Sequence, residues 1–425
     1  LRDLERRRKE MAGQDEKIRV VSINLANIGS TGKIVENIRQ VGKEENVIVY
    51  AAYPPSDACN PPKDGDILIG GKTGRYKSYQ MAYYTGFNGC FSVFATIKFL
   101  RTLNKVQPNV IHLHNLHHSY INVPLLFDYI KKKKIPVVWT LHDCWAFTGH
   151  CVYFTLSKCD KWINGCHDCP SYKEYPDSLV DRSKVMWKQK KKWFSNVPQM
   201  IIVTPSKWLA GLAKQSYLKD YQVEVINNGI DLSLFKPTQS NFRERYNIPA
   251  DTFIVLGVAF GWGVRKGLDI FIKLEKCLNP KFYKIVLVGT SPEIDKELPT
   301  NILSIHRTTN QHELAEIYTA ADLFVNPTRE DNFPTVNIEA LACGTPIVTF
   351  DTGGSPEVID ESCGKSICVD DVDELIQAIE TQRLNKKFTP ENCVKRARHF
   401  SDTDKFDEYI KLYRNLAKKE VFDET

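Results

Sequence analysis

The sequence predicts an α/β protein built from two doubly wound, parallel-sheet domains in series. Short runs rich in β-branched residues alternate along the chain with longer segments of helical spacing, and strands that alternate with helices form parallel sheets covered on both faces. This alternation restarts at Phe253 after a turn-rich stretch at residues 227–237, which indicates a second domain. Because doubly wound domains bind ligands at the carboxyl ends of their strands, we expect the active site in the cleft between the two domains.

Expected strands and helices occur in both halves of the chain. In the first half, strands are expected at residues 17–24, 46–51, 110–114, 136–141, 200–204 and 223–226, and helices at 33–41, 91–105, 124–134 and 207–214. In the second half, strands are expected at 253–258, 284–288, 302–305, 323–326 and 346–349, and helices at 268–278, 311–320, 335–342 and 371–381. The predicted domains are a charged tail (1–16), a first Rossmann-like domain (17–235) with a Cys-rich insertion at about 144–180, a second Rossmann-like domain (236–401) and an amphipathic C-terminal helix (402–425) that packs on either domain.

Composition excludes several classes of protein. The chain has 425 residues, of which 42% are hydrophobic and 25% charged, so collagen-like and disordered proteins are ruled out. No run approaches the ~18 apolar residues that span a bilayer, and no signal-peptide pattern follows the charged N-terminus. We therefore expect a cytoplasmic protein. Residues 1–235 carry 33 Lys and Arg against 21 Asp and Glu, whereas residues 236–425 carry 24 against 30, and a basic half suits phosphates, an anionic membrane or nucleic acid.

The most informative stretch for chemistry is residues 326–346, NPTREDNFPTVNIEALACGTP. Asp331 lies in a loop after a strand, and Glu339 lies about two turns inside the following helix, which Pro334 opens and Gly344 closes. Two carboxylates so placed can hold hydroxyls of one ligand while the free N–H groups of the helix face its phosphates. The alternative is that Asp331 only complements the helix dipole and Glu339 is an exposed acid.

This stretch resembles the Glu-x7-Glu signature of the retaining nucleotide-sugar glycosyltransferases of family 4, which have the two-domain GT-B fold. The resemblance implies that Glu339 binds the ribose of the nucleotide and that the first acid contacts the donor sugar or its phosphates. Here the first position is Asp331, with Glu330 beside it. The resemblance extends to four further turns, at Gly29-Ser30-Thr31-Gly32, Asn228-Gly229-Ile230-Asp231, Arg265-Lys266-Gly267 and Thr352-Gly353-Gly354-Ser355.

These matches imply roles for individual residues. Gly29, Gly32, Gly353 and Gly354 are expected to face the donor, and Lys266, with Arg265 in place of the family's arginine, to grip its diphosphate. His142 ends a strand and matches the family's histidine beside the reacting sugar; a satisfied structural histidine is the alternative. His114, Asn115, His117 and His118 are expected on the acceptor side.

The implied reaction moves a hexose from a UDP- or GDP-linked donor to a glycan or lipid-linked acceptor, as in bacterial polysaccharide biosynthesis. No Asp-x-Asp motif is present, so we expect metal-independent catalysis without a required cofactor. The nearest alternative is a GT-B-fold sugar-nucleotide epimerase, which would process the sugar without an acceptor. A zinc-bearing nucleic-acid-binding protein would leave the acidic second half unexplained, so we expect no nucleic-acid partner.

Twelve cysteines are many for a cytoplasmic protein, and four of them cluster in the insertion: Cys151, Cys159, Cys166 and Cys169. The two-residue gap between Cys166 and Cys169 suits a shared metal, so we predict a structural zinc site, with His150 and His167 as substitute ligands. Free thiols and disulfides are the alternatives. Cys277, Cys343 and Cys368 lie among apolar residues and are expected to be buried.

Two lysine-rich segments suggest contact with an anionic bilayer at the inner face of the cell membrane. They are Lys131–Lys134 and Lys184–Phe194, and the second places lysines beside Trp187, Trp193 and Phe194. The alternative is a solvated basic helix whose aromatic side chains turn into the core.

Overall fold

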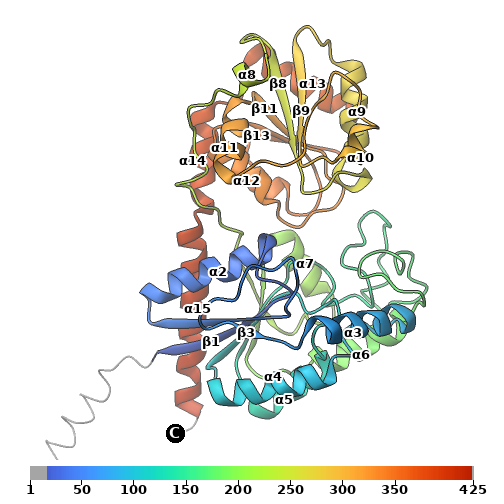
Figure 1. Ribbon diagram of the computed structural model, residues 1–425, viewed down its shortest axis with the longest axis vertical. Coiled ribbons are helices and arrows are strands. Elements are labelled where there is room, and N and C mark those ends of the chain that lie inside the picture. The colour runs from blue at the N-terminus through green and yellow to red at the C-terminus, as the bar shows by residue number, and fades with distance from the viewer. Residues whose placement is uncertain (1–16, 424–425) are drawn as a thin grey trace, which may run out of the picture.

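The computed structural model describes residues 17–423, with side chains to residue 418, so the predicted charged tail at 1–16 lies outside the described residues. Two lobes stack along the long axis of the molecule, each a parallel sheet flanked by helices (Figure 1). The two-domain GT-B prediction is therefore confirmed.

The first domain contains a seven-stranded sheet in the order β3-β2-β1-β4-β5-β6-β7, and all pairings are parallel. Its strands are β1 (Ile18–Ile23), β2 (Val47–Tyr53), β3 (Ile67–Leu68), β4 (Val110–Leu113), β5 (Val137–Thr140), β6 (Met200–Thr204) and β7 (Gln222–Val225). Its helices are α2 (Gly29–Glu44), α3 (Lys72–Thr85), α4 (Val93–Val106), α5 (Val123–Lys133), α6 (Ser183–Phe194) and α7 (Lys207–Gln215). The central strands β4, β5 and β6 are buried along their whole length, as expected for a parallel sheet covered on both faces.

The second domain repeats the plan with six parallel strands in the order β10-β9-β8-β11-β12-β13. Its strands are β8 (Phe253–Val258), β9 (Tyr283–Val288), β10 (Leu303–Ile305), β11 (Leu323–Asn326), β12 (Ile347–Phe350) and β13 (Gly364–Ile367). Its α-helices are α8 (Phe242–Arg245), α9 (Leu268–Cys277), α10 (Pro292–Asp295), α11 (Gln311–Ala320), α12 (Thr335–Ala342), α13 (Val372–Asn385) and α14 (Pro390–Ala397). Pro334 is the residue before α12 rather than its first residue.

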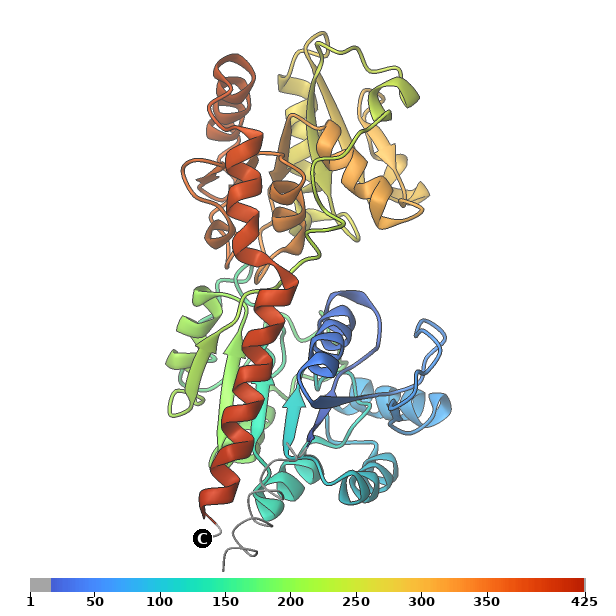
Figure 2. The ribbon, with the colours of Figure 1, turned by 90° about the vertical axis from the view of Figure 1, so that its left-hand side faces the viewer.

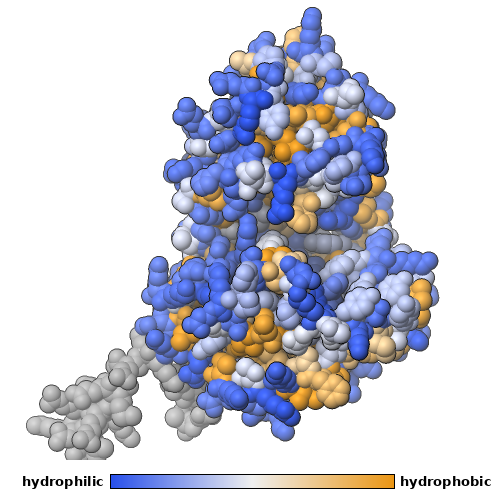
Figure 3. Space-filling view, viewed as in Figure 1, coloured by the Kyte–Doolittle hydropathy of each residue, from blue (hydrophilic) through white to orange (hydrophobic). Residues whose placement is uncertain are grey.

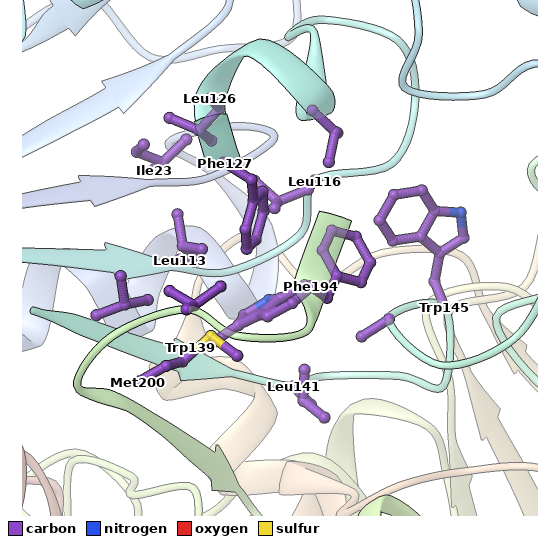
Figure 4. Packing of buried hydrophobic residues seen from close by; sticks show 14 of the residues in the cluster. Ile23, Leu113, Leu116, Leu126, Phe127, Trp139, Leu141, Trp145, Phe194 and Met200 are labelled. Atoms are coloured by element: carbon purple, nitrogen blue, oxygen red, sulfur yellow. The ribbon is translucent and has the colours of Figure 1, made fainter. Parts of the chain in front are cut away.

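The core of the first domain explains the aromatic side chains of α6. Trp139 of β5 packs against Phe127 of α5 and Phe194 of α6, with ring centroids 5.5 and 4.7 Å away, and the two phenylalanine rings also contact each other (Figure 4). Phe194 is fully buried, Trp187 is 8% exposed and Trp193 is partly buried against the same cluster. The prediction that α6 presents these aromatics to a membrane is therefore wrong, because they fill the space between α6 and the sheet.

Two of the three cysteines that were expected to be buried are exposed instead. Cys343 is buried, but Cys277 and Cys368 are exposed, since one lies in the last turn of α9 and the other just beyond the end of β13. Within residues 17–423, no helix combines the length and the apolar character needed to cross a bilayer.

The last helix, α15 (Asp402–Asp423), leaves the second domain and runs along the first (Figure 2). Its buried face consists of Phe406, Tyr409, Ile410, Tyr413 and Leu416, which join the cluster formed by α2 and one face of the first sheet. The start of α15 is fixed by backbone hydrogen bonds of 3.0 Å that Ile230 exchanges with Phe400 and Asp402. A Cβ on Gly229 would lie 2.5 Å from the Cα of Asp402, so this glycine is required where the two chain segments cross.

Truncation inside the buried face of α15 should therefore destabilise the first domain. Ile410 is fully buried, and Ile410→Ala is expected to lower the free energy of unfolding by about 2–5 kcal/mol. Asn415→Ala, at an exposed position of the same helix, should leave the urea midpoint close to that of the unchanged protein. Equal midpoints for the two variants would show that α15 does not stabilise the first domain.

Candidate active site

Hydrogen bonds across the interdomain boundary hold the loops of the two domains together. Asn332 of the second domain accepts from the Ser206 hydroxyl at 2.7 Å and donates to the His142 carbonyl at 3.2 Å. The Glu357 carboxylate accepts from the backbone N–H groups of Lys207 and Trp208, both at 2.8 Å. An acid of the second domain thus satisfies free N–H groups at the start of α7, where the helix dipole also favours negative charge.

A cavity of about 550 Å³ lies between the domains, beside the recess that separates the two lobes on the surface (Figure 3). The first domain contributes most of its lining, and Arg265 and Glu330 come from the second. Of the residues predicted from the sequence, the structure brings these to the cavity: His142, Asn115, His117, Arg265, Glu330 and the predicted metal ligand Cys151. This volume suits a small organic ligand.

His142 is held in place by a second imidazole. Its Nε2 lies 2.9 Å from Nδ1 of His114, whose Nε2 lies 3.0 Å from the Ser22 hydroxyl. Burial lowers the pKa of His142 to about 4, partly opposed by the charge of Asp143, and burial also lowers the pKa of His114. Both rings are therefore neutral near pH 7, and His114 supports His142 instead of facing the cavity itself.

A further histidine, His112, connects this pair to the C-terminal helix. His112 contacts the Thr140 hydroxyl at 2.8 Å and the Tyr413 hydroxyl at 2.6 Å, and its ring centroid lies 4.0 Å from that of His114. Thr140 in turn donates to the Tyr409 hydroxyl at 3.1 Å. The position of His142 thus depends, through stacked and hydrogen-bonded neighbours, on α15.

The other wall of the cavity contains an Asp–His–Tyr chain. Nε2 of His117 lies 3.1 Å from Asp143, and its Nδ1 lies 2.9 Å from the Tyr175 hydroxyl. Burial would raise the pKa of Asp143, but the charge and hydrogen bond of His117, with the N–H of Trp145, lower it overall. His118 lies outside this cavity, beside Tyr79 on α3, at a ring separation of 5.3 Å.

Lys266 and Asp331 form an ion pair with an Nζ–Oδ2 distance of 2.5 Å. Both side chains are about one fifth exposed, so an incoming anion can reach the lysine. Arg265 donates to the backbone carbonyl of Glu330 at 3.2 Å. The predicted basic pair and the predicted acids therefore lie together, at the carboxyl end of the second sheet.

The Glu330 carboxylate, which belongs to the second domain, binds residues of the first. Its Oε1 accepts from the Thr155 hydroxyl at 2.9 Å and from the backbone N–H of Leu156 at 2.7 Å. These partners belong to the Cys-rich insertion, so Glu330 binds the insertion to the second domain. Of the two adjacent acids, Asp331 is the one paired with a cationic side chain.

Glu339 is partly exposed on α12, where the Tyr318 hydroxyl donates to its Oε2 at 3.2 Å. Burial raises the pKa of Glu339, against the opposing effects of Tyr318 and of the charge of Lys33 on α2. Lys33 belongs to the first domain, so Glu339 lies where the two domains approach each other. It does not line the same cavity as His142.

Backbone conformation or close packing requires glycine at the four predicted glycine positions. Gly29 has φ +71° at the start of α2, and a Cβ on Gly32 would lie 2.5 Å from the backbone of Asn27. Both line a separate cavity of about 280 Å³ behind α2, whereas Ser30 and Thr31 face the interdomain cavity. A Cβ on Gly353 would lie 1.8 Å from the Asp331 carbonyl oxygen, and one on Gly354 would lie 2.5 Å from Cβ of Ser206 in the first domain.

Ser30 and Thr31 belong to the predicted glycine-rich turn, but several other residues of the cavity were not predicted: Asp143, Tyr153, Glu174 and Tyr175. Asp143 directly follows His142 at the end of β5, so its place after a strand was a usable signal. Tyr153, Glu174 and Tyr175 belong to the irregular insertion, where no periodicity indicates which side chains face inward.

Two family models match consecutive parts of the chain. The model described as Glycosyltransferase Family 4 matches residues 46–234, and that described as Glycosyl transferases group 1 matches residues 251–382. The fold and these matches define the protein as a glycosyltransferase. The chain belongs to the family 4 glycosyltransferases with the GT-B fold. This assignment confirms the resemblance.

The relatives cover different shares of the chain. The putative colanic acid biosynthesis glycosyl transferase WcaC of Escherichia coli K12 is 25% identical over 329 residues, which span 74% of this chain and 79% of that protein. D-inositol 3-phosphate glycosyltransferase of Xylanimonas cellulosilytica is 29% identical over 157 residues, or 32% of this chain and 37% of that protein.

Solved structures match the fold over nearly the whole chain. Sucrose-phosphate synthase of Thermosynechococcus elongatus aligns with a TM-score of 0.68 at 19% identity, covering 94% of this chain and 99% of that one. HepE of Anabaena, in complex with UDP and glucose, aligns with a TM-score of 0.66 at 14% identity and covers 94% and 100%.

The lowered pKa of His142 has a measurable consequence. A histidine in the unfolded chain has a pKa near 6.5, whereas the pKa of His142 in the folded protein is about 4. Between these two pH values the unfolded chain binds a proton at this residue and the folded protein does not. Stability should therefore be lost as the pH falls from about 6.5 toward 4. We expect the unfolding free energy of His142→Asn to fall less between pH 7.5 and 5 than that of the unchanged protein, by on the order of 1 kcal/mol. Parallel urea curves at the two pH values provide the measurement, and identical losses would contradict a buried neutral imidazole.

Proposed function

We propose that the protein transfers a hexose from a nucleotide-diphosphate sugar to a hydroxyl of a glycan or lipid-linked acceptor, with retention of the anomeric configuration. The observation that carries this proposal is the interdomain cavity, which His142 and Arg265 line from opposite domains. HepE of Anabaena was solved with UDP-glucose, and WcaC is named for colanic acid biosynthesis. These names support a UDP-linked donor, with GDP as the alternative, and a polysaccharide product.

In the proposed donor complex, Glu339 accepts hydrogen bonds from the ribose hydroxyls and the diphosphate lies near Lys266. No side chain caps the start of α2 or of α12, so both helices offer free N–H groups of the kind that bind phosphate. Lys266 would exchange Asp331 for the donor diphosphate, which leaves the Asp331 carboxylate available to a sugar hydroxyl.

The proposed chemistry uses the donor's own leaving group. Negative charge develops on the departing diphosphate, and Lys266, Arg265 and the helix N-termini stabilise it without a protein-bound metal. Attack from the leaving-group face lets a diphosphate oxygen take the acceptor proton, so no side chain is assigned as the base. Neutral His142, fixed by His114 at 2.9 Å, orients a donor hydroxyl, and the closed domains exclude water.

The surface of α3 and α4 supports a membrane-borne acceptor. The two helices are joined by a hydrogen bond of 2.9 Å between Ser92 and Ser78. They expose six large apolar or aromatic side chains: Tyr76, Met81, Tyr84, Val93, Phe94 and Ile97. They also carry six cationic residues and no acid: Lys72, Arg75, Lys77, Lys98, Arg101 and Lys105. We call these twelve residues the α3–α4 surface.

Apolar side chains among cations suit an anionic lipid surface. Apolar groups appear on the face of the lower lobe over these helices (Figure 3). Helix α3 also lies near the cavity, because Tyr79 packs beside His118 and His118 stacks on Tyr175, which lines the cavity. We therefore propose that the protein works at the cytoplasmic face of the cell membrane on a lipid-linked glycan, held there by the α3–α4 surface rather than by α6.

The donor assignment predicts two separable kinetic effects. Loss of one charged hydrogen bond is worth roughly 1.5–3 kcal/mol, so Glu339→Gln should raise the donor dissociation constant about ten- to hundredfold. Lys266→Ala should mainly lower kcat. Calorimetric titration with UDP- and GDP-linked sugars, followed by kinetics with the best donor, measures both effects.

Matched controls are available on exposed positions of the same domain, Glu361→Gln and Lys281→Ala, which should behave like the unchanged protein. Unchanged donor binding and turnover in the two site variants would overturn the assignment. Release of a free epimerised sugar nucleotide without any acceptor would instead identify an epimerase.

The membrane proposal is tested by sedimentation with vesicles. The protein should sediment with phosphatidylglycerol vesicles at low salt and much less with phosphatidylcholine vesicles. Phe94 is 89% exposed and Met81 50%, so Phe94→Ser with Met81→Ser should reduce binding several-fold. Leu384→Ser removes a side chain of 68% exposure from the second domain and serves as the control. Equal binding to both lipids, or equal binding by the double variant and the control, would refute the proposal.

A further inference from the structure

The chain between β5 and α6, residues 141–182, contains neither helix nor strand, although it builds a wall of the active site. Tyr153, Glu174 and Tyr175 line the interdomain cavity, and Thr155 and Leu156 hold Glu330. Irregular segments of this length are uncommon inside compact domains. Interactions other than the backbone hydrogen bonds of a helix or sheet must therefore keep this segment ordered.

Four cysteines of this segment surround one small space. Cys151, Cys159, Cys166 and Cys169 all line a cavity of about 10 Å³, which is roughly the volume that one water-sized occupant needs. Cys166 Sγ accepts from the N–H of Gly149 at 3.1 Å. All four are free thiols.

The four sulfurs border the cavity without converging on its centre. Across residues 17–423, no three His, Cys, Asp or Glu side chains already stand in a metal-binding arrangement. Binding an ion therefore requires the thiol groups to turn toward the space that they already line. His167 lines the same cavity, but its Nδ1 contacts the Gly165 carbonyl at 3.0 Å, so the cysteines are the better ligand set.

A buried lysine beside the cluster supplies a second, independent observation. The side chain of Lys190 on α6 is fully buried, and its Nζ donates to the carbonyls of Trp145 and Thr148 at 2.8 and 3.1 Å. Among the described residues no carboxylate forms an ion pair with Lys190. Thr148 precedes Gly149, whose N–H donates to Cys166 Sγ at 3.1 Å, so Lys190 lies close to the cluster. A buried ammonium is costly without a counter-charge, and thiolates at this cluster would provide one.

We propose that Cys151, Cys159, Cys166 and Cys169 bind one Zn²⁺ in a closed structural site. Binding converts four thiols to thiolates and releases four protons, and the resulting site has a net charge of −2 that Lys190 partly offsets. Four thiolates complete the tetrahedral preference of zinc and leave no position for substrate. The ion fixes the wall of the cavity and takes no part in glycosyl transfer, so the proposal is independent of donor and acceptor.

Metal analysis of protein purified without chelators tests this proposal. We expect about one zinc per chain, lost in Cys166→Ser and in Cys169→Ser and retained in Cys277→Ser, which removes an exposed thiol elsewhere. Both site variants should also lower the Tm by several degrees relative to Cys277→Ser.

A thiol measurement on the unchanged protein avoids dependence on how well the variants fold. In the native protein, a mercurial reagent that displaces thiolate ligands should release one equivalent of zinc to a chromogenic chelator. Zinc-free protein in which all twelve cysteines react as free thiols would overturn the proposal. A mass lower by about two daltons for each cysteine pair would overturn it too, because it would identify disulfides.

Discussion

The constraint on which the rest of this structure depends is that the carboxyl ends of two parallel sheets must face each other across a narrow gap. Each sheet carries only part of the site: His142 lies at the carboxyl end of the first sheet, and Lys266 lies near the carboxyl end of the second. Helix α15 maintains this arrangement, because it begins on the second domain and buries five side chains on the first. Carboxylates of the second domain, on Glu330 and Glu357, then satisfy backbone and hydroxyl donors of the first. The acidic and basic halves of the chain meet through these contacts.

Much of the fold could be predicted, because long buried strands and amphipathic helices leave strong periodic signals. Every strand predicted from the sequence exists, with ends that differ by a residue or two. Strands β3 and β13 were not predicted. β3 has only two residues and β13 has four, one of them Gly364, so neither shows a clear hydrophobic pattern. Helix α3 was missed because its tyrosines and lysines are exposed together, so no apolar stripe marks a buried face.

Part of the site was predictable because its side chains lie in loops that follow strands: His142 after β5, Arg265 between β8 and α9, and Asp331 between β11 and α12. The site was not predictable where a tertiary partner decides the role of a residue. Glu330 and Asp331 are adjacent acids in sequence, yet one binds the insertion and the other pairs with Lys266. Similarly, the lysine run of α6 looks uniformly solvated, but Lys190 lies at the position that helical spacing turns inward beside Trp187 and Phe194.

The hydrogen bond between His112 and Tyr413 joins residues 301 positions apart, and this separation bears on how the protein is made. A growing chain emerges N-terminus first, so the first domain leaves the ribosome with one face of its sheet covered only in part. Only when residues 402–423 have been synthesised can α15 cover Val20, Val110 and Val138. Contacts of such long sequence separation form late and slowly, and apolar surface left open meanwhile favours aggregation. Completion of the histidine cluster therefore requires synthesis of residues 402–413, and a nascent chain that has not reached them lacks the Tyr409 and Tyr413 contacts of His112.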